Sequence, residues 1–517
     1  MIVYPAEAPP AGDTASGDVP DQLGRLVADA LGGHGLRLDP ADSARMRAGA
    51  EILERRLAEG AEVYGVTRGF GPLVRHPAAA DRAAQGLGLI HHLCAGQGPA
   101  LSRGASALMV WLRLRSMRQG HSGVSTATWR HLAELHGRGF VPVVPSEGSL
   151  SASGDLVPLA HAALAFGGGG EAWQDGRPAP SDAVLAGLGL TPVRWDARSA
   201  LAFVNGTSAS LAVAILEHRE LALQARAVTT LTGRIVRRLG CSPQPYAEPL
   251  NRVRNQPGQR RAAAWVRAGL GPDPRPHAGR PLQEPYSLRC VPQVAGAVLD
   301  QLDAQGRILL AEAGGCTDNP VVVDEQVWHG GNFHAAPVGL VADQLTLCAH
   351  QLALLAERQL ALLLDPAHNG GRPPMLTPRP GAASGLAGVQ IAASSFVAKM
   401  RQLGYPATLT PIPTNLGNQD HVPMALNGAT AGAETIRLGW LVIGSLALAV
   451  QQLDRLDGRP APEEPLWAEL WQCLPPLDTD QPLAGAVREA AGRLRGCLLP
   501  PGRVDATPWA GADALVQ

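Results

Sequence analysis

The segment Gly148-Ser149-Leu150-Ser151-Ala152-Ser153-Gly154-Asp155-Leu156-Val157-Pro158-Leu159-Ala160-His161 joins an Ala-Ser-Gly tripeptide to an apolar run with helical spacing. This tripeptide can cyclise. The backbone nitrogen of Gly154 attacks the carbonyl carbon of Ala152 with loss of one water, and Ser153 then loses its hydroxyl as a second water. Glycine suits the first step because it has no Cβ and its nitrogen can approach another carbonyl closely. The product is a methylidene-imidazolone ring with an electron-poor double bond, so the sequence predicts an electrophile made from the chain.

The letters Ala-Ser-Gly-Asp also occur at 15–18. That copy lies in a Pro- and Gly-rich stretch without apolar periodicity, so we expect residues 1–22 to form a disordered tail and this copy to be inert. The copy at 152–154 lies instead between a loop at 141–146 and an apolar helical run at 156–166. At a helix N-terminus, free N–H groups and the helix dipole favour negative charge on the ring. The other interpretation of this copy is a Ser/Asp helix cap.

Further motifs follow along the chain: YGVTRGFG at 64–71, VNGTS at 204–208, QEPYSLRC at 283–290, TDNP at 317–320, HGGNFH at 329–334 and NQDHV at 418–422. Together with the Ala-Ser-Gly block, and in this order, they resemble the aromatic amino acid and histidine ammonia-lyase family over residues 63–483. Within that family, the motifs of this sequence most resemble those of bacterial tyrosine ammonia-lyases. The resemblance implies that the ring forms autocatalytically from Ala152-Ser153-Gly154 and that no metal and no external cofactor is needed.

The chemistry of ammonia removal explains why such residues are required. An unactivated C–N bond has to break and a barely acidic β-proton has to leave, so an electrophile and a positioned base are both needed. The ring supplies the electrophile. Tyr64 is the candidate base, and Gly65, Gly69 and Gly71 would let its loop close over the site. A phenol ionises near pH ~10, so this base needs nearby positive charge or dipoles. A buried structural tyrosine is the alternative.

Arg289 is the candidate partner for the substrate carboxylate, because a guanidinium presents two coplanar donors to two oxygens. The resemblance places further residues in the substrate pocket, where they also hold the ring. These predicted pocket residues are Asn205, Gln283, Tyr286, Phe333, Asn415 and Gln419.

The pair His92-Leu93 resembles the selectivity position of tyrosine ammonia-lyases, where phenylalanine-selective relatives have an aromatic residue in place of the histidine. An imidazole can hydrogen-bond a phenol, whereas an apolar ring cannot. Gln419 stands where histidine ammonia-lyases place a glutamate, which weakens the case for a histidine substrate. The pair His421-Val422 nevertheless resembles the histidine branch. Adjacent histidines such as His91-His92 are also often only polar groups satisfied within a core.

Three glycines depart from the family pattern, namely Gly86, Gly88 and Gly314, where relatives usually have polar residues. They widen the pocket for an unusual aryl group, or they shift the reaction toward re-addition of ammonia at the β-carbon. We therefore expect non-oxidative deamination of an aromatic L-amino acid, tyrosine favoured, to the trans-cinnamate-type acid and ammonia. An aryl-amino acid 2,3-aminomutase and a histidine ammonia-lyase are the alternatives.

Two hypotheses from other classes are weaker. A helical binding protein that lost its activity does not explain why Tyr64, Ser153 and Arg289 are all retained. A metal hydrolase built on His91, His92, His121 and His161 lacks the HxxxH or HExxH spacing of such sites.

The composition indicates a large enzyme that does not bind a highly charged macromolecule or membrane. The chain has 517 residues and a formal net charge of -1, so nucleic acid and membrane surfaces are poor candidates. Its seven cysteines show no CxxC spacing, which favours a reducing cytoplasm. The longest apolar stretch, 438–450, is shorter than the ~20 residues that cross a bilayer and predicts a buried helix. The family resemblance implies a homotetramer whose active sites are each shared between subunits.

The apolar periodicity predicts a mainly α fold with a long central helix bundle. Helices are expected at 99–118, 208–231, 338–364 and 389–403, strands at 141–144, 321–323 and 327–328, and a mobile loop at 255–281. The expected parts are a tail (1–22), an N-terminal part with the catalytic loop and the tripeptide (23–207), the bundle (208–483), and a C-terminal helix and tail (484–517).

Overall fold

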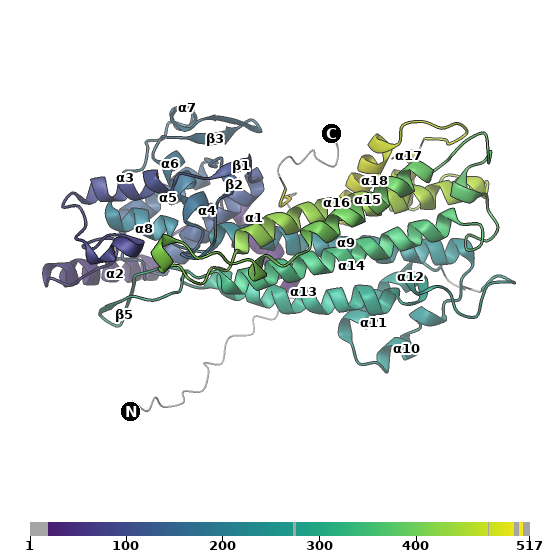
Figure 1. Cartoon of the computed structure of the whole chain (residues 1–517), viewed down its shortest axis with the longest axis horizontal. Coiled ribbons are helices and arrows are strands. Elements are labelled where there is room, and N and C mark those ends of the chain that lie inside the picture. Colours follow the sequence, from purple (N-terminus) through teal and green to yellow (C-terminus); the bar gives the residue numbers. More distant parts are fainter. Residues whose placement is uncertain (1–18, 272–273, 275, 474, 501–505, 510–517) are drawn as a thin grey trace.

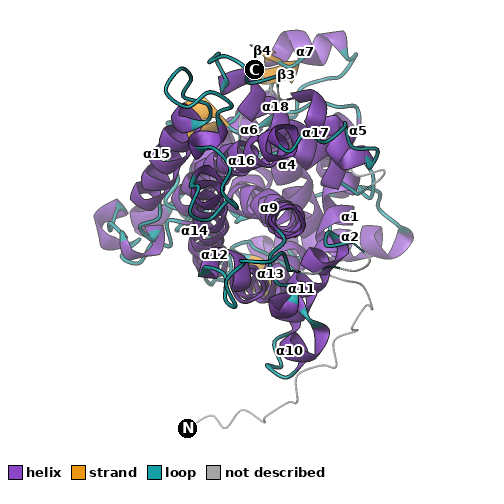
Figure 2. Ribbon diagram, turned by 90° about the vertical axis from the view of Figure 1, so that its right-hand side faces the viewer, coloured by secondary structure: helices purple, strands orange, loops and turns teal. Residues whose placement is uncertain are grey.

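Long helices running alongside one another dominate the structure (Figure 1). The computed structural model describes residues 19–271, 274, 276–473, 475–500 and 506–509. The bundle helices are α9 (Ser208–Leu239), α13 (Val291–Gly314), α14 (Ala336–Leu364), α15 (Ala387–Leu403) and α16 (Ala425–Leu456). Figure 2 looks along the bundle and shows α9 near its centre, with α13, α14 and α16 around it. The mainly α fold class is confirmed, and the predicted helices at 208–231, 338–364 and 389–403 lie within α9, α14 and α15.

Sequence explains why α9 is central. Its first part, residues 208–216, contains only small and apolar residues and is buried on every side, which is typical of a helix surrounded by others. It ends at Gly240, which takes the left-handed conformation (φ 62°) that glycine adopts without a Cβ penalty. The stretch at 438–450 is likewise buried, within α16.

Three helical segments are long and apolar enough to cross a membrane by length and composition: Ala197–Leu239, Ala336–Leu364 and Ala425–Leu456. Their apolar windows are 100%, 61% and 89% buried inside the protein, in that order. Helix-to-helix packing therefore uses most of this apolar surface. Helix α14 keeps the most of it exposed, including Leu340 and Leu347.

A smaller N-terminal part sits at one end of the bundle (Figure 1). Its elements are α1 (Val19–Leu31), α2 (Pro40–Ala58), η1 (Gly71–Arg75), α3 (Arg82–Leu93), β1 (Gln97–Ala100), α4 (Arg103–Met117), α5 (Thr126–Gly137), β2 (Pro145–Glu147), α6 (Leu156–Phe166), β3 (Glu171–Gln174), β4 (Arg177–Pro180), α7 (Ser181–Gly187) and α8 (Ala197–Val204). Strands β1 and β2 pair antiparallel, with Gln97 opposite Glu147, and β2 leads into the tripeptide loop.

The remaining elements connect and cover the bundle. They are η2 (Gln244–Tyr246), α10 (Glu248–Arg252), α11 (Pro257–Ala268), α12 (Tyr286–Arg289), β5 (Val321–Val323), β6 (Gln326–Trp328), η3 (Pro374–Leu376), η4 (Ala407–Leu409), η5 (Asn415–Gly417), α17 (Pro465–Cys473) and α18 (Ala484–Leu498). The hairpin β5–β6 confirms the strands predicted at 321–323 and 327–328.

Several local predictions are wrong. Pro99 lies in strand β1, and the helix predicted from it begins only at Arg103, where the Oγ of Ser102 accepts from the N–H of Ala105. The strand predicted at 141–144 forms instead at Pro145–Glu147. The predicted loop at 255–281 contains α11, because Ala262, Ala263 and Val266 supply a buried apolar face between its arginines.

At the N-terminus, the predicted tail at 1–22 overlaps α1, because residues 19–22 are already helical. Residues 1–18, with the second Ala-Ser-Gly-Asp copy, lie outside the described residues.

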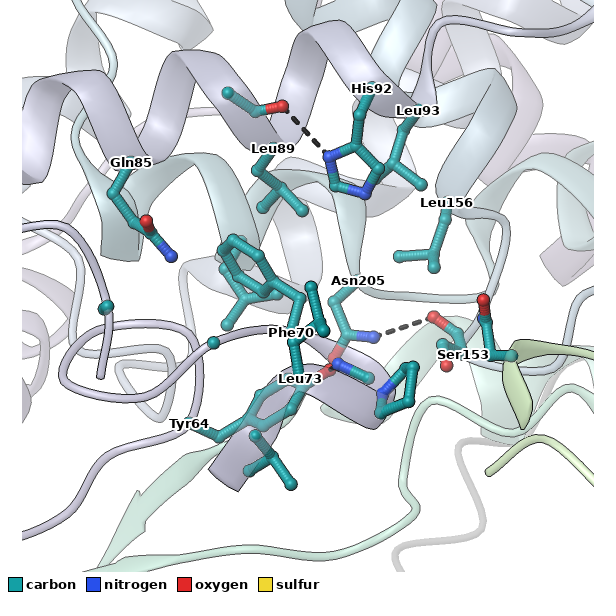
Figure 3. A pocket seen from close by; sticks show the side chains of 18 of the residues that line it. Tyr64, Phe70, Leu73, Gln85, Leu89, His92, Leu93, Ser153, Leu156 and Asn205 are labelled. Carbon is teal, nitrogen blue, oxygen red and sulfur yellow. Dashed lines mark hydrogen bonds between the residues drawn. The ribbon is translucent and has the colours of Figure 1, made fainter. Parts of the chain in front are cut away.

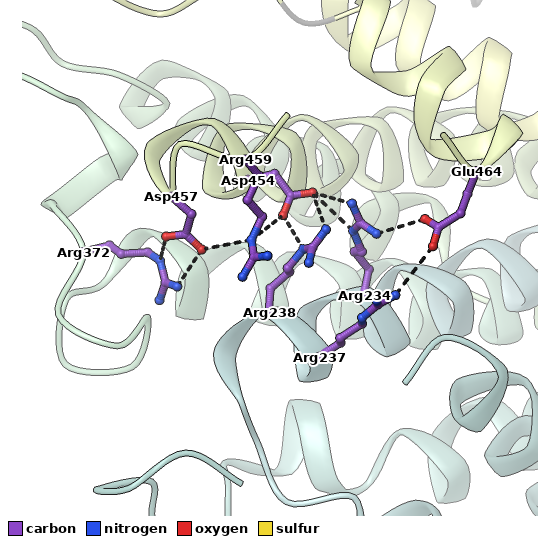
Figure 4. A network of polar contacts seen from close by, with 8 residues as sticks. All are labelled: Arg234, Arg237, Arg238, Arg372, Asp454, Asp457, Arg459 and Glu464. Atoms are coloured by element: carbon purple, nitrogen blue, oxygen red, sulfur yellow. Dashed lines mark hydrogen bonds and ion pairs between the residues drawn. The ribbon is translucent and has the colours of Figure 1, made fainter. Parts of the chain in front are cut away.

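A network of ion pairs links the helices at the end of the bundle far from the N-terminal part (Figure 4). Asp454 near the end of α16 is 1% exposed, and its carboxylate pairs with Arg234 (2.7 Å) and Arg238 of α9. Next to it, Arg372 grips Asp457 through both carboxylate oxygens (2.8 and 2.9 Å). The Asp454 pairs fix α9 to α16, and the Asp457 pair holds the segment after α14 against the end of α16.

Candidate active site

The tripeptide lies in a tight loop directly before α6. Ala152 and Gly154 form an isolated backbone bridge on either side of Ser153, and Gly154 has a φ of 71°, in the left-handed region that favours glycine. A Cβ at Gly154 would collide with the backbone of Gly206. The backbone of Gly206, in the motif at 204–208, thus lies directly against the tripeptide. Glycine is needed here for both its conformation and its size.

Hydrogen bonds from the 204–208 motif hold the same loop. The Nδ2 of Asn205 donates to the carbonyl oxygen of Ser153 (2.7 Å), and the N–H of Asp155 donates to the carbonyl oxygen of Gly206 (2.7 Å). Gly206 in turn lies against the guanidinium of the fully buried Arg113, which leaves no room for a side chain at 206. These contacts hold the backbone around Ser153 in a tight loop.

Asp155 anchors this loop rather than capping α6. Its carboxylate makes no cap hydrogen bond to the helix; it accepts from the Oγ of Ser151 (2.7 Å), the Oγ of Ser149 (3.2 Å), and the N–H and Oγ of Ser210 (2.7 and 2.9 Å). Burial raises the pKa of Asp155, and these four donors oppose that shift. The capping interpretation therefore does not hold for Asp155, whose side chain instead ties the loop to α9.

Tyr64 lies in the glycine-flanked loop before η1. Its phenol oxygen accepts from the N–H of Gly71 (2.8 Å), and its own N–H donates to the Nε2 of His329 (3.1 Å). Burial raises the pKa of Tyr64, while the bond from Gly71 opposes the rise. The loop needs glycine at position 65, where φ is 73° and a Cβ would lie 2.6 Å from Leu201.

Most of the predicted residues converge on one cavity of about 930 Å³ (Figure 3). The predicted residues that line it are Tyr64, His92, Leu93, Ser153, Asn205, Phe333, Asn415 and Gln419. Gln419 lies beside the tripeptide, where its Nε2 donates to the Oγ of Ser153 (2.8 Å). The cavity thus brings together the candidate base, the serine predicted to form the ring and the histidine predicted to select the substrate.

Gln283, Tyr286 and Arg289 do not line this cavity within one chain. They belong to α12 and the loop before it, at the other end of the bundle from α3 (Figure 1). Helix α13, with 24 residues, separates the two ends by ~36 Å at 1.5 Å per residue. Gln283 and Arg289 line a different cavity of about 400 Å³, and the guanidinium of Arg289 stacks on the exposed Tyr286 ring (4.5 Å). Within one chain, the substrate carboxylate therefore has no guanidinium from Arg289.

His92 lies on α3 at the rim of the cavity. Its Nδ1 is 2.9 Å from the carbonyl oxygen of Gly88, and a carbonyl can only accept, so Nδ1 carries the hydrogen and donates. In the neutral ring this leaves Nε2 as an acceptor. The ring of Phe70 lies 6.4 Å away, centroid to centroid. Leu93 adds only apolar surface beside it.

The three unusual glycines have different surroundings. A Cβ at Gly86 would lie 2.5 Å from the carbonyl oxygen of Asp196, so this glycine permits close packing of α3 on the start of α8 and does not widen the cavity. Gly88 lines the cavity, and a Cβ there would meet nothing within 4 Å. Gly314 lies outside the cavity lining, and its carbonyl accepts from the Nε2 of Gln119 (2.9 Å). Of the three, Gly88 alone opens space at the site.

Several lining residues were not predicted, among them Phe70, Gln85, Leu156 and Leu201. Gln85 shares a helix face with His92 because seven residues make almost two turns, and that spacing is readable from the sequence. Leu156 directly follows the tripeptide block. Leu201 carries no such signal, since only the packing of α8 brings it to the cavity.

The histidines considered for a metal do not cluster. The Nδ1 of His121 donates to the carbonyl of Val322, and the Nε2 of His161 accepts from the N–H of Gly96. Among the described residues, no group of three or more His, Cys, Asp or Glu side chains is placed to hold a metal ion.

Known proteins share both the sequence and the fold. A family profile described as aromatic amino acid lyase matches residues 22–474. The chain is 34% identical to a histidine ammonia-lyase of Bradyrhizobium diazoefficiens over 94% of this chain and 95% of the relative. The tyrosine aminomutase structure from Streptomyces globisporus superposes with a TM-score of 0.85 at 28% identity, covering 92% of this chain and 95% of that one. Histidine ammonia-lyase from Trypanosoma cruzi gives a TM-score of 0.82 at 26% identity, covering 93% and 92%.

Proposed function

This chain belongs to the aromatic amino acid lyase family, and we propose that it is an ammonia-lyase that converts L-tyrosine to the trans-4-hydroxycinnamate-type acid and ammonia. In this reaction the Cα–N bond breaks, the β-proton passes to a base, and a double bond forms between Cα and Cβ. The observation that carries the substrate choice is the hydrogen bond from His92 Nδ1 to Gly88, which leaves an acceptor nitrogen beside the cavity. A tyrosine hydroxyl can donate to that nitrogen.

We further propose that Ala152-Ser153-Gly154 matures into the methylidene-imidazolone ring. The surroundings fit this group, because Gly206 leaves no room for a side chain at 154 and Asn205 holds the Ser153 carbonyl. Once formed, the ring supplies an electrophile that makes the substrate amine a better leaving group. Before ring formation Gln419 donates to the Oγ of Ser153, the oxygen that leaves as water, so its amide lies beside the ring once the ring has formed.

Tyr64 is the proposed base. It lies in the same cavity as Ser153, but burial raises the pKa of its phenol, which opposes the deprotonated form that a base requires. Among the described residues, the N–H of Gly71 donates to the phenol oxygen and opposes this rise in the pKa. Positive charge from a second copy of the chain would complete the activation.

We therefore also propose a homotetramer in which Gln283, Tyr286 and Arg289 of one chain complete the cavity of another. Two observations support this assembly. Helix α13, ~36 Å long, separates α12 from the cavity, and large apolar side chains remain exposed on the bundle, such as Leu340, Leu347 and Ile391. The described cysteines are free thiols, which is compatible with the cytoplasmic location that we propose.

Product analysis with L-tyrosine, L-phenylalanine and L-histidine tests the proposed substrate. We expect wild type to favour tyrosine over phenylalanine, and His92→Phe to reverse the order because an apolar ring replaces the acceptor. Release of urocanate with no turnover of tyrosine would establish the histidine reaction instead, as in the relative from Bradyrhizobium. Accumulation of β-tyrosine would establish an aminomutase. An unchanged tyrosine-to-phenylalanine ratio in His92→Phe would remove His92 from substrate selection.

A further inference from the structure

One face of α3 presents two different hydrogen-bonding side chains to the cavity. Gln85, Gly88 and His92 are spaced three and four residues apart and all line it. Figure 3 shows Gln85 and His92 projecting from the same helix, with Gln85 on the side of the cavity away from Ser153. The role proposed above for His92 leaves Gln85 and Gly88 unexplained.

The amide of Gln85 is oriented by the loop that covers the cavity. Its Oε1 accepts from the backbone N–H of Ala79 (3.2 Å). With the oxygen engaged there, the Nε2 presents two N–H groups, and Figure 3 shows this nitrogen directed toward the cavity. Among the described residues no acceptor pairs with it. Gln85 therefore offers a donor, whereas His92 offers an acceptor.

Leu89 lies between these two side chains (Figure 3), and Gly88 leaves open space beside them. It is one helical turn from His92, it lines the cavity, and a Cβ at this position would meet nothing within 4 Å. Any larger residue here would extend into the space beside the substrate ring. The α3 face thus combines an acceptor, an open gap and a donor.

We propose that this face reads two neighbouring substituents on the substrate ring, and that the preferred substrate class is an L-tyrosine with a hydrogen-bond acceptor next to its hydroxyl. The inference rests on the proposed tyrosine-type function. The ring hydroxyl donates to the Nε2 of His92, and the adjacent group, for example a second hydroxyl, accepts from the Nε2 of Gln85. A plain tyrosine would leave the Gln85 donor unpaired, which is unfavourable wherever the closed site excludes water.

Equilibrium binding to the full-length Ser153→Ala protein tests the reading without any turnover. The probes are 4-hydroxycinnamate and 3,4-dihydroxycinnamate. We expect the dihydroxy acid to bind about fivefold more tightly, the ratio that one net hydrogen bond provides. Gln85→Met, which keeps the side-chain volume and removes the donor, should abolish this preference, and Gly88→Asn should reverse it by filling the gap. His91→Met on the same helix, outside the cavity lining, is the matched control and should leave the ratio unchanged.

Turnover of L-tyrosine and L-3,4-dihydroxyphenylalanine by the ring-forming protein gives the second readout. We expect Gln85→Met to lower the dihydroxy-to-monohydroxy ratio of kcat/KM by about fivefold. If tyrosine is deaminated but neither ratio responds to Gln85→Met, the two-substituent reading is overturned and the proposed function stands. If neither cinnamate-type acid binds and only histidine is deaminated, the proposed function fails and this inference fails with it.

Discussion

Tyr64 is the proposed base, so we expect its ionisation to control the rate of the proposed reaction. Its pKa is raised mainly by burial, and it acts as a base only when deprotonated. Turnover should therefore rise with pH as the deprotonated fraction grows, and fall as the pH drops below the pKa of the phenol. Tyr64→Phe should lower kcat by about 10²-fold and remove this rise. A variant with near-normal kcat and the wild-type pH profile would show that the base is another group.

At this scale the sequence predicted much of the site. Tyr64, His92, Ser153 and Gln419 line one cavity, and each could be predicted because it lies in a short motif whose chemistry is local. Arg289 was placed at the site by the family resemblance, which also implied sites shared between subunits, and within one chain it lies at the far end of the bundle from the cavity. No pattern of neighbouring residues encodes the length of α13, and that length decides which groups one chain can bring together.

Two glycines in α3 provide a matched test at the scale of elements. Gly88→Ala should stabilise the helix by about 0.5–1 kcal/mol because alanine is the better helix former and nothing lies within 4 Å of the new Cβ. Gly86→Ala should destabilise the protein despite the same gain in propensity, because its Cβ meets the carbonyl of Asp196 at 2.5 Å. Thermal unfolding of both variants measures the difference. Equal shifts for the two would contradict the close packing of α3 on α8.

The ion pairs at the end of the bundle make a second prediction for elements. Asp454→Asn removes the buried carboxylate that Arg234 and Arg238 share and leaves Arg234 only the half-exposed Glu464, so we expect a loss of about 3–5 kcal/mol in the free energy of unfolding. The control is Glu54→Gln, which breaks the exposed pair with Arg82 and should cost less than about 1 kcal/mol. Denaturant unfolding checks both. A similar small effect for the two would mean that this network does not fasten α9 to α16.

Element prediction succeeded where apolar periodicity was long and failed where it was short or interrupted. Helices α9, α14 and α15 follow from sustained spacing over many turns. Helix α11 was missed because its apolar face consists mainly of small alanines among arginines. The strand near residue 145 was shifted because its pairing with β1 depends on a distant segment.

The whole-molecule proposal is that one site uses residues from different copies. Co-expression of two defective chains, Tyr64→Phe and Arg289→Ala, tests it. Each variant alone should have little activity, but mixed assemblies should regain it, since some sites would combine an intact Tyr64 with an intact Arg289. If both residues acted from the same chain, every site in the mixture would carry one defect and activity would stay low. Size-exclusion chromatography of the mixture verifies that the chains have assembled.

The central claim, that the chain makes its own electrophile, is tested most directly by the intact mass of the purified active protein. We expect a mass below that of the sequence by two water molecules, with the loss located at residues 152–154 by peptide fragmentation. Ser153→Ala should fold, lack the ring and show no activity, since alanine has no hydroxyl to lose. A full, unmodified mass in active wild-type protein would contradict the claim.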